Sequence, residues 1–260
     1  MAGTDRSALQ DDLLPAALMP AVILSHPQMG ENIGAAARAM KNCGCDDLRL
    51  VNPRDGWPNP AAEAMASGGA DILTAASVFD TTSQAVEDLT LLIATTARKR
   101  GMAQTVMTPR QAAEAIMAHH QAGGRAGMLF GAERAGLDND EAALANIIVT
   151  VPLNPAFSSL NLAQAVLLMG WECRMAGLAL SPDMISNSSD GDDIASLGER
   201  EFFYGVLEDS IAKGGFFASP DMRPVIMRNI RAMFNKAPLS TQDIRTLHGI
   251  IKAIARSGDS

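Results

Sequence analysis

The chain has 260 residues, of which 47% are hydrophobic and 19% charged, a composition typical of a globular protein and unlike that of a disordered one. Its formal net charge of −8 disfavours a protein that holds nucleic acid by bulk positive charge, although local basic patches are compatible with it. The three cysteines show no zinc-type pairing and the N-terminus does not resemble a signal peptide, so we expect a cytoplasmic protein without a bound metal. The most apolar segment, residues 160–180, contains Glu172 and Arg174, which disfavours a membrane span.

Short apolar runs alternate with helical patterns through the first two thirds of the chain. Strands are predicted at residues 21–24, 48–51, 89–95, 126–130 and 147–151, and helices at about 32–42, 60–66, 82–88, 109–121, 139–144 and 160–180. Asn32 is expected to cap the first helix, and Pro109 to begin the helix at 109–121. Because the strands are apolar throughout and alternate with helices, we predict an α/β fold with a mainly parallel sheet and helices on both faces.

Composition divides the chain into four parts. Residues 1–19 are predicted to form a flexible tail and residues 20–180 the α/β domain. Residues 181–198 are rich in Ser, Asp, Asn and Gly, which predicts a flexible linker. Residues 199–260 are predicted to form a small C-terminal helical module, whose helical patterns lie at about 197–212, 221–234 and 240–256.

Common cofactor signatures are missing from the sequence. It has no GxGxxG after a strand, no GxxxxGK[ST], no GxSxG and no HExxH. A nucleotide-dependent oxidoreductase is therefore disfavoured. His119 and His120 lie late in a polar helix, where we expect them to be exposed to solvent and to have no role in binding a metal.

Two groups of polar residues lie at predicted helix starts. Asn154, Ser158, Ser159 and Asn161 gather around the start of the apolar helix at 160–180, where the serines could either cap that helix or line a ligand site. The stretch from Asn32 to Arg38 starts the first helix. Gly34 lies one turn before Arg38 and would leave space beside its guanidinium, although a cap and a solvated arginine explain the same residues.

Two further groups follow predicted strands. Residues 95–100 (TTARKR) come directly after an apolar run, which is where a parallel sheet meets phosphates, although a basic triplet is also common in solvated loops. Residues 130–137 (FGAERAGL) carry glycines that let the backbone approach a ligand, or that simply make a turn. Because all four groups fall at strand ends or at the helix starts that follow, we expect them to form one site.

Together these stretches resemble a known family. Asn32–Met40 (NIGAAARAM), Phe130–Leu137 (FGAERAGL) and Asn154–Leu162 (NPAFSSLNL) are similar to the three ordered motifs of the SpoU (TrmH-like) SPOUT methyltransferases. The span 20–180 resembles their catalytic domain. The pattern at 95–98 and the C-terminal helical segment resemble the TrmJ branch of that family.

The resemblance implies a fold, a cofactor and an assembly. The fold would be the SPOUT fold, an α/β sheet whose chain forms a trefoil knot, which no sequence rule predicts. The cofactor would be S-adenosylmethionine and the assembly a homodimer. The reaction would be methylation of a ribose 2′-hydroxyl in tRNA, at the pyrimidine of position 32 in the anticodon loop.

The resemblance also assigns residues by motif. The cofactor would contact Thr95, Thr96, Ala97, Gly131, Val151, Ser158, Ser159 and Leu160. Arg38 would be the catalytic arginine, with Asn32, Glu133, Ser159 and Asn161 around it. Since a guanidinium titrates above about pH 12, we expect Arg38 to hold a phosphate and stabilise the developing alkoxide; it need not act as the base.

The acidic chain must meet tRNA through local basic patches. The candidates are Arg38, Arg98, Lys99 and Arg100, together with Arg223, Arg228, Arg231 and Lys236 in the C-terminal module. The helix at 160–180 is apolar around most of its circumference, so a symmetric partner could bury the excess. The main alternative is a protein of the same fold that binds RNA without transferring methyl groups; the motif residues Arg38, Glu133, Ser159 and Asn161 argue against it.

Overall fold

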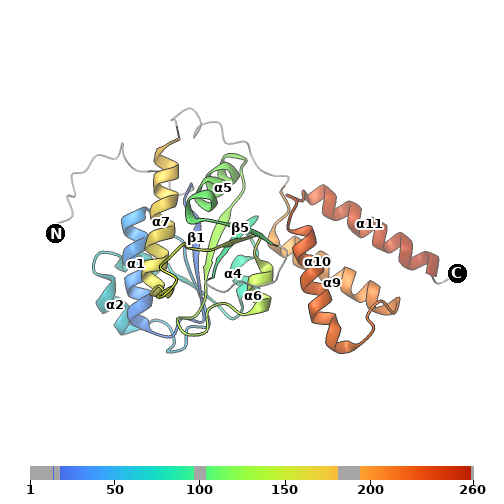
Figure 1. Cartoon of the computed structure of the whole chain (residues 1–260), viewed down its shortest axis with the longest axis horizontal. Helices are drawn as coiled ribbons and strands as arrows, with labels where there is room; N and C mark the ends of the chain where they lie inside the picture. Colours follow the sequence, from blue (N-terminus) through green and yellow to red (C-terminus); the bar gives the residue numbers. More distant parts are fainter. Residues whose placement is uncertain (1–13, 15–17, 97–103, 181–193, 259–260) are drawn as a thin grey trace.

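The structure is a computed structural model that describes residue 14 and residues 18–96, 104–180 and 194–258 of the chain (Figure 1). Within these residues a sheet of seven strands has the order β3-β2-β1-β6-β4-β7-β5, and each pair of neighbours is parallel. The strands are β1 Ala21–Ser25, β2 Leu48–Val51, β3 Ser77–Phe79, β4 Leu91–Thr95, β5 Thr105–Met107, β6 Ala126–Phe130 and β7 Ile147–Val149. The predicted parallel sheet is confirmed.

Helices cover both faces of this sheet (Figure 1). They are α1 Gly30–Cys43, α2 Pro60–Ala66, α3 Ala70–Ala75, α4 Thr82–Val86, α5 Pro109–Gln121, α6 Asn139–Leu144 and α7 Leu162–Leu178. Successive strand residues point to opposite faces, so Val22 and Leu24 pack with α1, α2, α5 and α7, whereas Ile23 packs with α4 and α6. The strands β1 and β6 are buried along their whole length, which explains why they read as continuous apolar runs.

Sequence reasoning missed three short elements. The strands β3 and β5 have three residues each and lie at the two edges of the sheet, where Val78 and Val106 are exposed. The helix α3 has six residues, of which Ile72 and Leu73 are buried. Edge strands and single-turn helices bury too few side chains to leave an apolar pattern in the sequence.

The three predicted C-terminal helices are present, as α9 Leu197–Lys213, α10 Arg223–Phe234 and α11 Thr241–Gly258, with the short turn η3 Pro220–Met222 before α10. They share a small core of their own, formed by Ala195, Phe203, Tyr204, Met227 and Ile244. The predicted domain boundaries at residues 20, 180 and 199 stay predictions, because much of the expected tail and linker lies outside the described residues.

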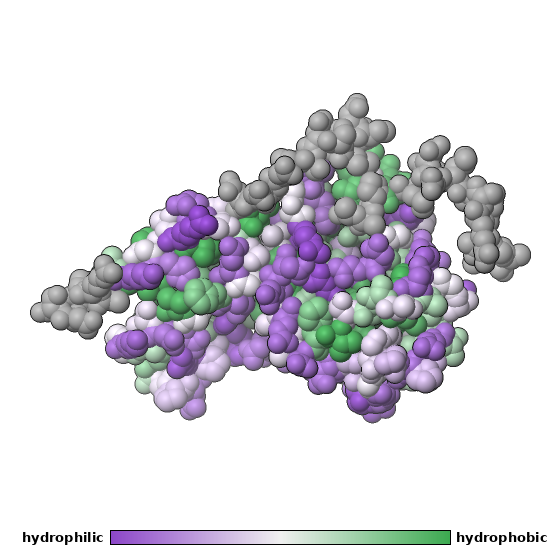
Figure 2. All heavy atoms as spheres, turned by 180° about the vertical axis from the view of Figure 1, so that it is seen from behind, coloured by the Kyte–Doolittle hydropathy of each residue, from purple (hydrophilic) through white to green (hydrophobic). Residues whose placement is uncertain are grey.

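Polar contacts join these helices to the α/β domain. The backbone N–H of Leu197 donates to the carbonyl of Leu89 at 2.8 Å, and the side-chain amide of Asn235 donates to the carbonyl of Ala143 at 3.3 Å. The guanidinium of Arg228 pairs with Asp140 at 3.0 Å. On the rear face, hydrophilic side chains cover much of the surface between the two parts (Figure 2). The helices therefore dock on the α4 and α6 side of the sheet.

The expectation that His119 and His120 are exposed is wrong. His120 is buried and its Nδ1 lies 3.1 Å from the carbonyl oxygen of Gly124, while His119 Nε2 lies 2.6 Å from Thr90 Oγ1. Burial, with His120 and Arg200 nearby, lowers the pKa of His119 to about 4. Both rings pack at the C-terminal end of α5, against Thr90 and Gly124. The hydrophobic pattern of the α5 sequence alone could not reveal these contacts. Among the described residues no cluster could hold a metal ion, and no helix is long and apolar enough to cross a membrane.

Gly34 also has a different role from the one expected. A Cβ atom at this position would lie 2.1 Å from the carbonyl oxygen of Ala62, so α1 and α2 pack backbone against backbone there. Arg38, in contrast, is exposed on α1. The glycine is thus required for the contact between two helices and does not make room for the guanidinium.

Replacing Gly34 with alanine tests this packing. We expect Gly34→Ala to lower the free energy of unfolding by about 1–3 kcal/mol, because the added methyl group must push α2 away from α1. Gly205→Ala is the matched control, since a Cβ there meets nothing within 4 Å on the exposed side of α9. That substitution should stabilise the helix by about 0.5–1 kcal/mol. Thermal unfolding of both variants measures the difference, and equal melting temperatures for Gly34→Ala and the unsubstituted protein would contradict the packing.

Candidate functional site

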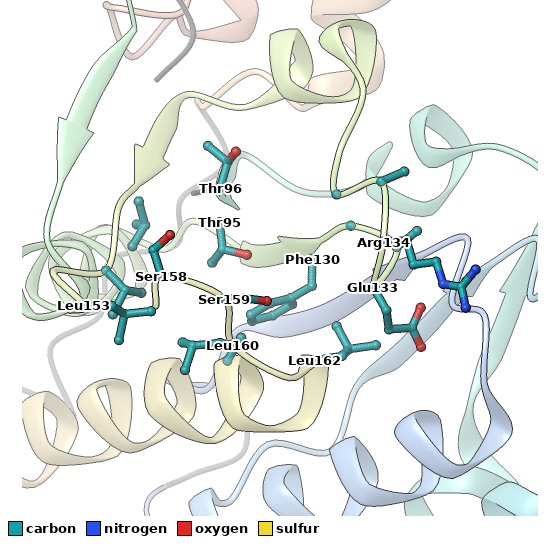
Figure 3. Close-up of a pocket in the computed structure, with 17 residues that line it drawn as sticks. Thr95, Thr96, Phe130, Glu133, Arg134, Leu153, Ser158, Ser159, Leu160 and Leu162 are labelled. Atoms are coloured by element: carbon teal, nitrogen blue, oxygen red, sulfur yellow. The ribbon is translucent and has the colours of Figure 1, made fainter. Parts of the chain in front are cut away.

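A pocket of about 280 Å³ lies at the carboxyl edge of the sheet (Figure 3). Its walls come from the loops that follow β4, β6 and β7, which are neighbours in the sheet. The lining residues are Thr95, Thr96, residues 130–136, Val149, Val151, Leu153, Ser158, Ser159, Leu160, Leu162 and Ala165. Ligands of parallel α/β proteins bind at this edge, because the strand ends leave a crevice between their loops.

The structure brings most of the expected cofactor residues to this pocket. Thr95, Thr96, Gly131, Val151, Ser158, Ser159 and Leu160 all line it, whereas Ala97 lies outside the described residues. In Figure 3 the serines and Leu160 form the wall beside α7, and Thr95 and Thr96 lie on the strand side. Expected cofactor residues that are up to 65 positions apart in the chain, Thr95 and Leu160, thus share one cavity.

Ser158 and Ser159 are not helix caps. The helix α7 begins at Leu162, and its N-cap is Asn161, whose side chain accepts from the backbone N–H of Ala163 at 2.9 Å. Gln164 completes the capping box by accepting from the backbone N–H of Asn161. The two serines precede this cap in an exposed loop, so their hydroxyl groups are available to a ligand in the pocket.

The loop after β6 forms a wall made of backbone. The N–H of Gly136 donates to the carbonyl of Ala132 at 2.7 Å, and Gly136 has a φ of 65°. A Cβ on Gly131 would lie 2.2 Å from the backbone nitrogen of Leu137. Both glycines are therefore needed for the turn itself, which folds 131–137 tightly enough to present backbone groups to the cavity.

A chain of hydrogen bonds links this loop to the starts of α1 and α7. Glu133 accepts from the backbone N–H of Gln28 and from the side-chain amide of Asn32, both at 2.8 Å. The side-chain oxygen of Asn32 in turn accepts from the amide of Asn161 at 2.9 Å. The Glu133 carboxylate, which lines the pocket, is thus fixed by donors from two other segments.

The expectation that Asn32 caps α1 is wrong. The helix begins at Gly30, and its N-cap, Met29, makes no side-chain cap hydrogen bond. Asn32 therefore lies inside the first turn, where its amide is free to connect Glu133 with Asn161. Arg38 does not line the pocket; it lies further along α1 on the exposed surface. Within this chain, four of the five expected catalytic residues lie together and the arginine lies apart from them.

The expected RNA-binding arginines are less available than the sequence suggested. Arg228 pairs with Asp140 at 3.0 Å, and Arg231 pairs with Glu201 at 2.9 Å while its guanidinium lies over the ring of Tyr204. Burial is the largest single influence on Arg231 and opposes its charge, but the hydrogen bonds to Glu201 and the nearby charges together raise its pKa. Arg98, Lys99 and Arg100 lie outside the described residues. RNA contact by these side chains stays a prediction.

Sequence reasoning did not single out the residues at the ends of β1 and β2. His26 and Asn52 follow these strands directly, and both have positive φ angles, 48° and 42°. Non-glycine residues adopt this backbone rarely and often at functional sites. The available signal was weak, since a polar residue followed by proline at a strand end also reads as an ordinary turn.

The fold and the pocket together define an α/β protein with a ligand site made by strand-end loops, and comparison with known proteins identifies its family. The SpoU rRNA Methylase family model matches residues 19–171, and the chain belongs to this family. The expected SPOUT fold and the resemblance to the TrmJ branch are confirmed.

Several relatives are similar over most of their length. The crystal structure of TrmJ from Z. mobilis ZM4 is 48% identical, covers 90% of this chain and 98% of its own, and superposes with a TM-score of 0.80. The "tRNA (cytidine/uridine/adenosine-2′-O-)-methyltransferase TrmJ" of Pseudomonas aeruginosa is 36% identical over 87% of this chain and 89% of its own. The "tRNA (cytidine/uridine-2′-O-)-methyltransferase TrmJ" of Salmonella typhimurium is 33% identical over 90% of this chain and 95% of its own.

Proposed function

We propose that this protein transfers a methyl group from S-adenosylmethionine to the ribose 2′-hydroxyl of a tRNA nucleotide, the pyrimidine at position 32 of the anticodon loop, in the cytoplasm. The observation that carries the proposal is the meeting of the 130–137 and 154–162 motifs in one pocket, with Asn32 of the first motif bonded to both. The names of the similar proteins, tRNA 2′-O-methyltransferases of the TrmJ type, support the substrate class.

The pocket suits the proposed cofactor chemically. Leu153, Leu160 and Val149 offer apolar surface for a purine ring, and the hydroxyl groups of Thr95 and Ser158 offer hydrogen bonds for sugar and polar groups. S-adenosylmethionine, when bound, supplies an electrophilic methyl group. Glu133 is one of the lining residues, and its negative charge would favour a positively charged sulfonium nearby.

Other side chains must bind the RNA and activate its ribose hydroxyl. A ribose hydroxyl is a weak acid, so the site must orient it and stabilise the negative charge that develops on its oxygen. Arg38 can hold a phosphate in a bidentate manner and stabilise that charge, because a guanidinium presents parallel N–H donors in a fixed planar geometry. Since Arg38 is exposed and stands outside its own protomer's pocket, it would act on RNA at the surface or at a partner's pocket.

We infer that the protein is a homodimer formed through α7. Leu167, Trp171, Met175 and Leu178 follow one another at helical spacing and are 42%, 53%, 44% and 48% exposed. A stripe of this length on a helix that is already packed against α1 and α5 exposes apolar surface that a second copy could bury. The neighbouring helix α1 carries Arg38, so this interface would bring the arginine towards the twofold axis.

Calorimetry tests the cofactor. We expect the protein to bind S-adenosylhomocysteine and not NAD, which separates a methyltransferase from the oxidoreductase alternative. Gly131→Ala should weaken S-adenosylhomocysteine binding at least about tenfold, because the new methyl group would meet the backbone of Leu137 and open the wall of the pocket. Gly205→Ala serves as the control. Binding of NAD, or an unchanged affinity in Gly131→Ala, would contradict the assignment of this pocket.

Arg38→Ala tests the reaction. We expect methyl transfer from labelled S-adenosylmethionine to tRNA to fall at least about 100-fold at saturating RNA, because one charged donor to the transition state is lost. Lys41→Ala, which removes another exposed cation of α1, one that pairs with Asp71 of α3, should retain activity. Near-normal turnover in Arg38→Ala would refute the role of the arginine, and nucleoside mass spectrometry of tRNA identifies the methylated position. A wild-type protein that binds tRNA without methylating it would favour the catalytically silent alternative.

Light scattering tests the assembly. The unsubstituted protein should be a dimer at micromolar concentration, and Trp171→Glu should be a monomer because a charge would be buried at the centre of the stripe. Phe202→Glu is the matched control, since Phe202 is 70% exposed on α9, away from α7, and its substitution should leave the dimer intact. An unsubstituted monomer contradicts the inference.

A further inference from the structure

A second hollow, of about 510 Å³, adjoins the pocket along the carboxyl edge of the sheet. Its floor comes from the ends of β1 and β2, with His26, Gln28, Asn52 and Arg54, and its wall from residues 132 and 135–138. Both cavities are lined by Ala132, Ala135 and Gly136, so the 131–137 turn separates them. The two cavities also meet through one contact: Glu133 lines the first, and it accepts from the backbone N–H of Gln28, which lines the second.

The backbone places two side chains together in this hollow. Ser25 and Val51 are partners in the register of β1 and β2, so His26 and Asn52 leave the sheet side by side. Both then adopt the left-handed conformation, and Asn52 Nδ2 lies 3.4 Å from His26 Nδ1. The left-handed conformation costs free energy, and here two neighbouring strand ends adopt it. This indicates that the direction in which the two side chains point is important for function.

The polar groups of the hollow favour a neutral ligand. The guanidinium of Arg54 is already paired with Asp55 at 2.8 Å, and the acidic residues Asp138 and Glu141 also line the hollow. A phosphate would meet this negative charge without a free cation among the described residues that line the hollow. Within the described part of the chain, no hydrogen bond engages the side-chain amide of Gln28 or the side-chain oxygen of Asn52. These groups are free to bind a planar ring with donors and acceptors on its edge.

We propose that this hollow holds the base of the nucleotide whose ribose is methylated, and that Gln28 and Asn52 bind the hydrogen-bonding edge of a pyrimidine. The inference rests on the proposed function and adds the means of base recognition. Bases that are flipped out of an RNA loop are bound in this way, by side chains that reach their edges. The hollow is placed suitably for it: the ribose must reach a cofactor in the first pocket, so the base of the same nucleotide would lie beside that pocket.

This chemistry has a consequence for substrate choice. At ring position 4 cytosine carries a hydrogen-bond donor and uracil an acceptor. At N3 the roles are reversed, since cytosine accepts and uracil donates. A carboxamide can turn over to offer either its N–H or its oxygen, so Gln28 and Asn52 can pair with both bases. We therefore expect the unsubstituted protein to methylate cytidine and uridine with similar kcat/KM.

The test replaces each amide by the carboxylate of the same shape. Asn52→Asp and Gln28→Glu can only accept, and aspartate tolerates the left-handed backbone at position 52. Methyl transfer is measured on two tRNA transcripts that differ only in having cytidine or uridine at the target position. We expect the ratio of kcat/KM for the two transcripts to change about tenfold in at least one variant. A carboxylate facing position 4 favours cytidine, and one facing N3 favours uridine.

Two controls keep the outcomes distinct. Asn42→Asp adds the same charge at an exposed position near the end of α1 and should leave the ratio unchanged. Calorimetry with S-adenosylhomocysteine should give equal affinity for all these proteins, since the substituted side chains lie outside the first pocket. A ratio within about twofold of the unsubstituted value in both Asn52→Asp and Gln28→Glu would overturn base recognition by this hollow and leave the proposed function standing. Failure of the unsubstituted protein to methylate either transcript would overturn both.

Discussion

The hydrogen bonds that join Glu133 to Asn32 and Asn32 to Asn161 are the contact on which the geometry of the site depends. They span 101 and 129 residues of sequence and connect the loop after β6 with the starts of α1 and α7. A half-buried carboxylate is stable only when donors surround it, and here one donor is an amide from α1 and the other a backbone N–H of the β1–α1 loop. Each loop alone could adopt other conformations, so this chain of bonds fixes the cavity.

The parallel sheet supplies the rigid part of the same arrangement. The strands β6, β4 and β7 are neighbours, and since they run in one direction their carboxyl ends deliver three loops to one edge. Close packing of backbone against backbone at two glycines also holds the helices and the turn in place. Gly34 lets α1 meet α2, and Gly131 lets the 131–137 turn fold on itself. Both glycines act through the absence of a Cβ atom, which is why neither contact tolerates a larger residue.

The distribution of charge limits the ways in which this acidic protein can bind an RNA substrate. The net charge of −8 provides no general attraction, and Arg228 and Arg231 are already paired with carboxylates. Among the residues that the structure describes, RNA recognition would therefore rely on a few individual groups. The first pocket offers hydroxyls and apolar walls, the adjoining hollow offers amides, and Arg38 is exposed on α1, a helix that packs against α7. A site of this kind gains specificity from shape and hydrogen bonds more than from long-range attraction.

The amino-acid sequence alone determined the five inner strands of the sheet, most of its helices and many residues of the pocket, because buried strands such as β1 and β6 consist almost entirely of apolar residues and the motifs keep their order along the chain. It did not determine the partners of Asn32, the burial of His120 or the contact of Gly34 with Ala62. Those depend on segments far apart in sequence, and a residue that caps a helix in one context bonds to a distant carboxylate in another. Only the tertiary structure decided that Arg38 lies outside the pocket and that His26 and Asn52 share a hollow next to it, since both follow from how strands and helices pack in space.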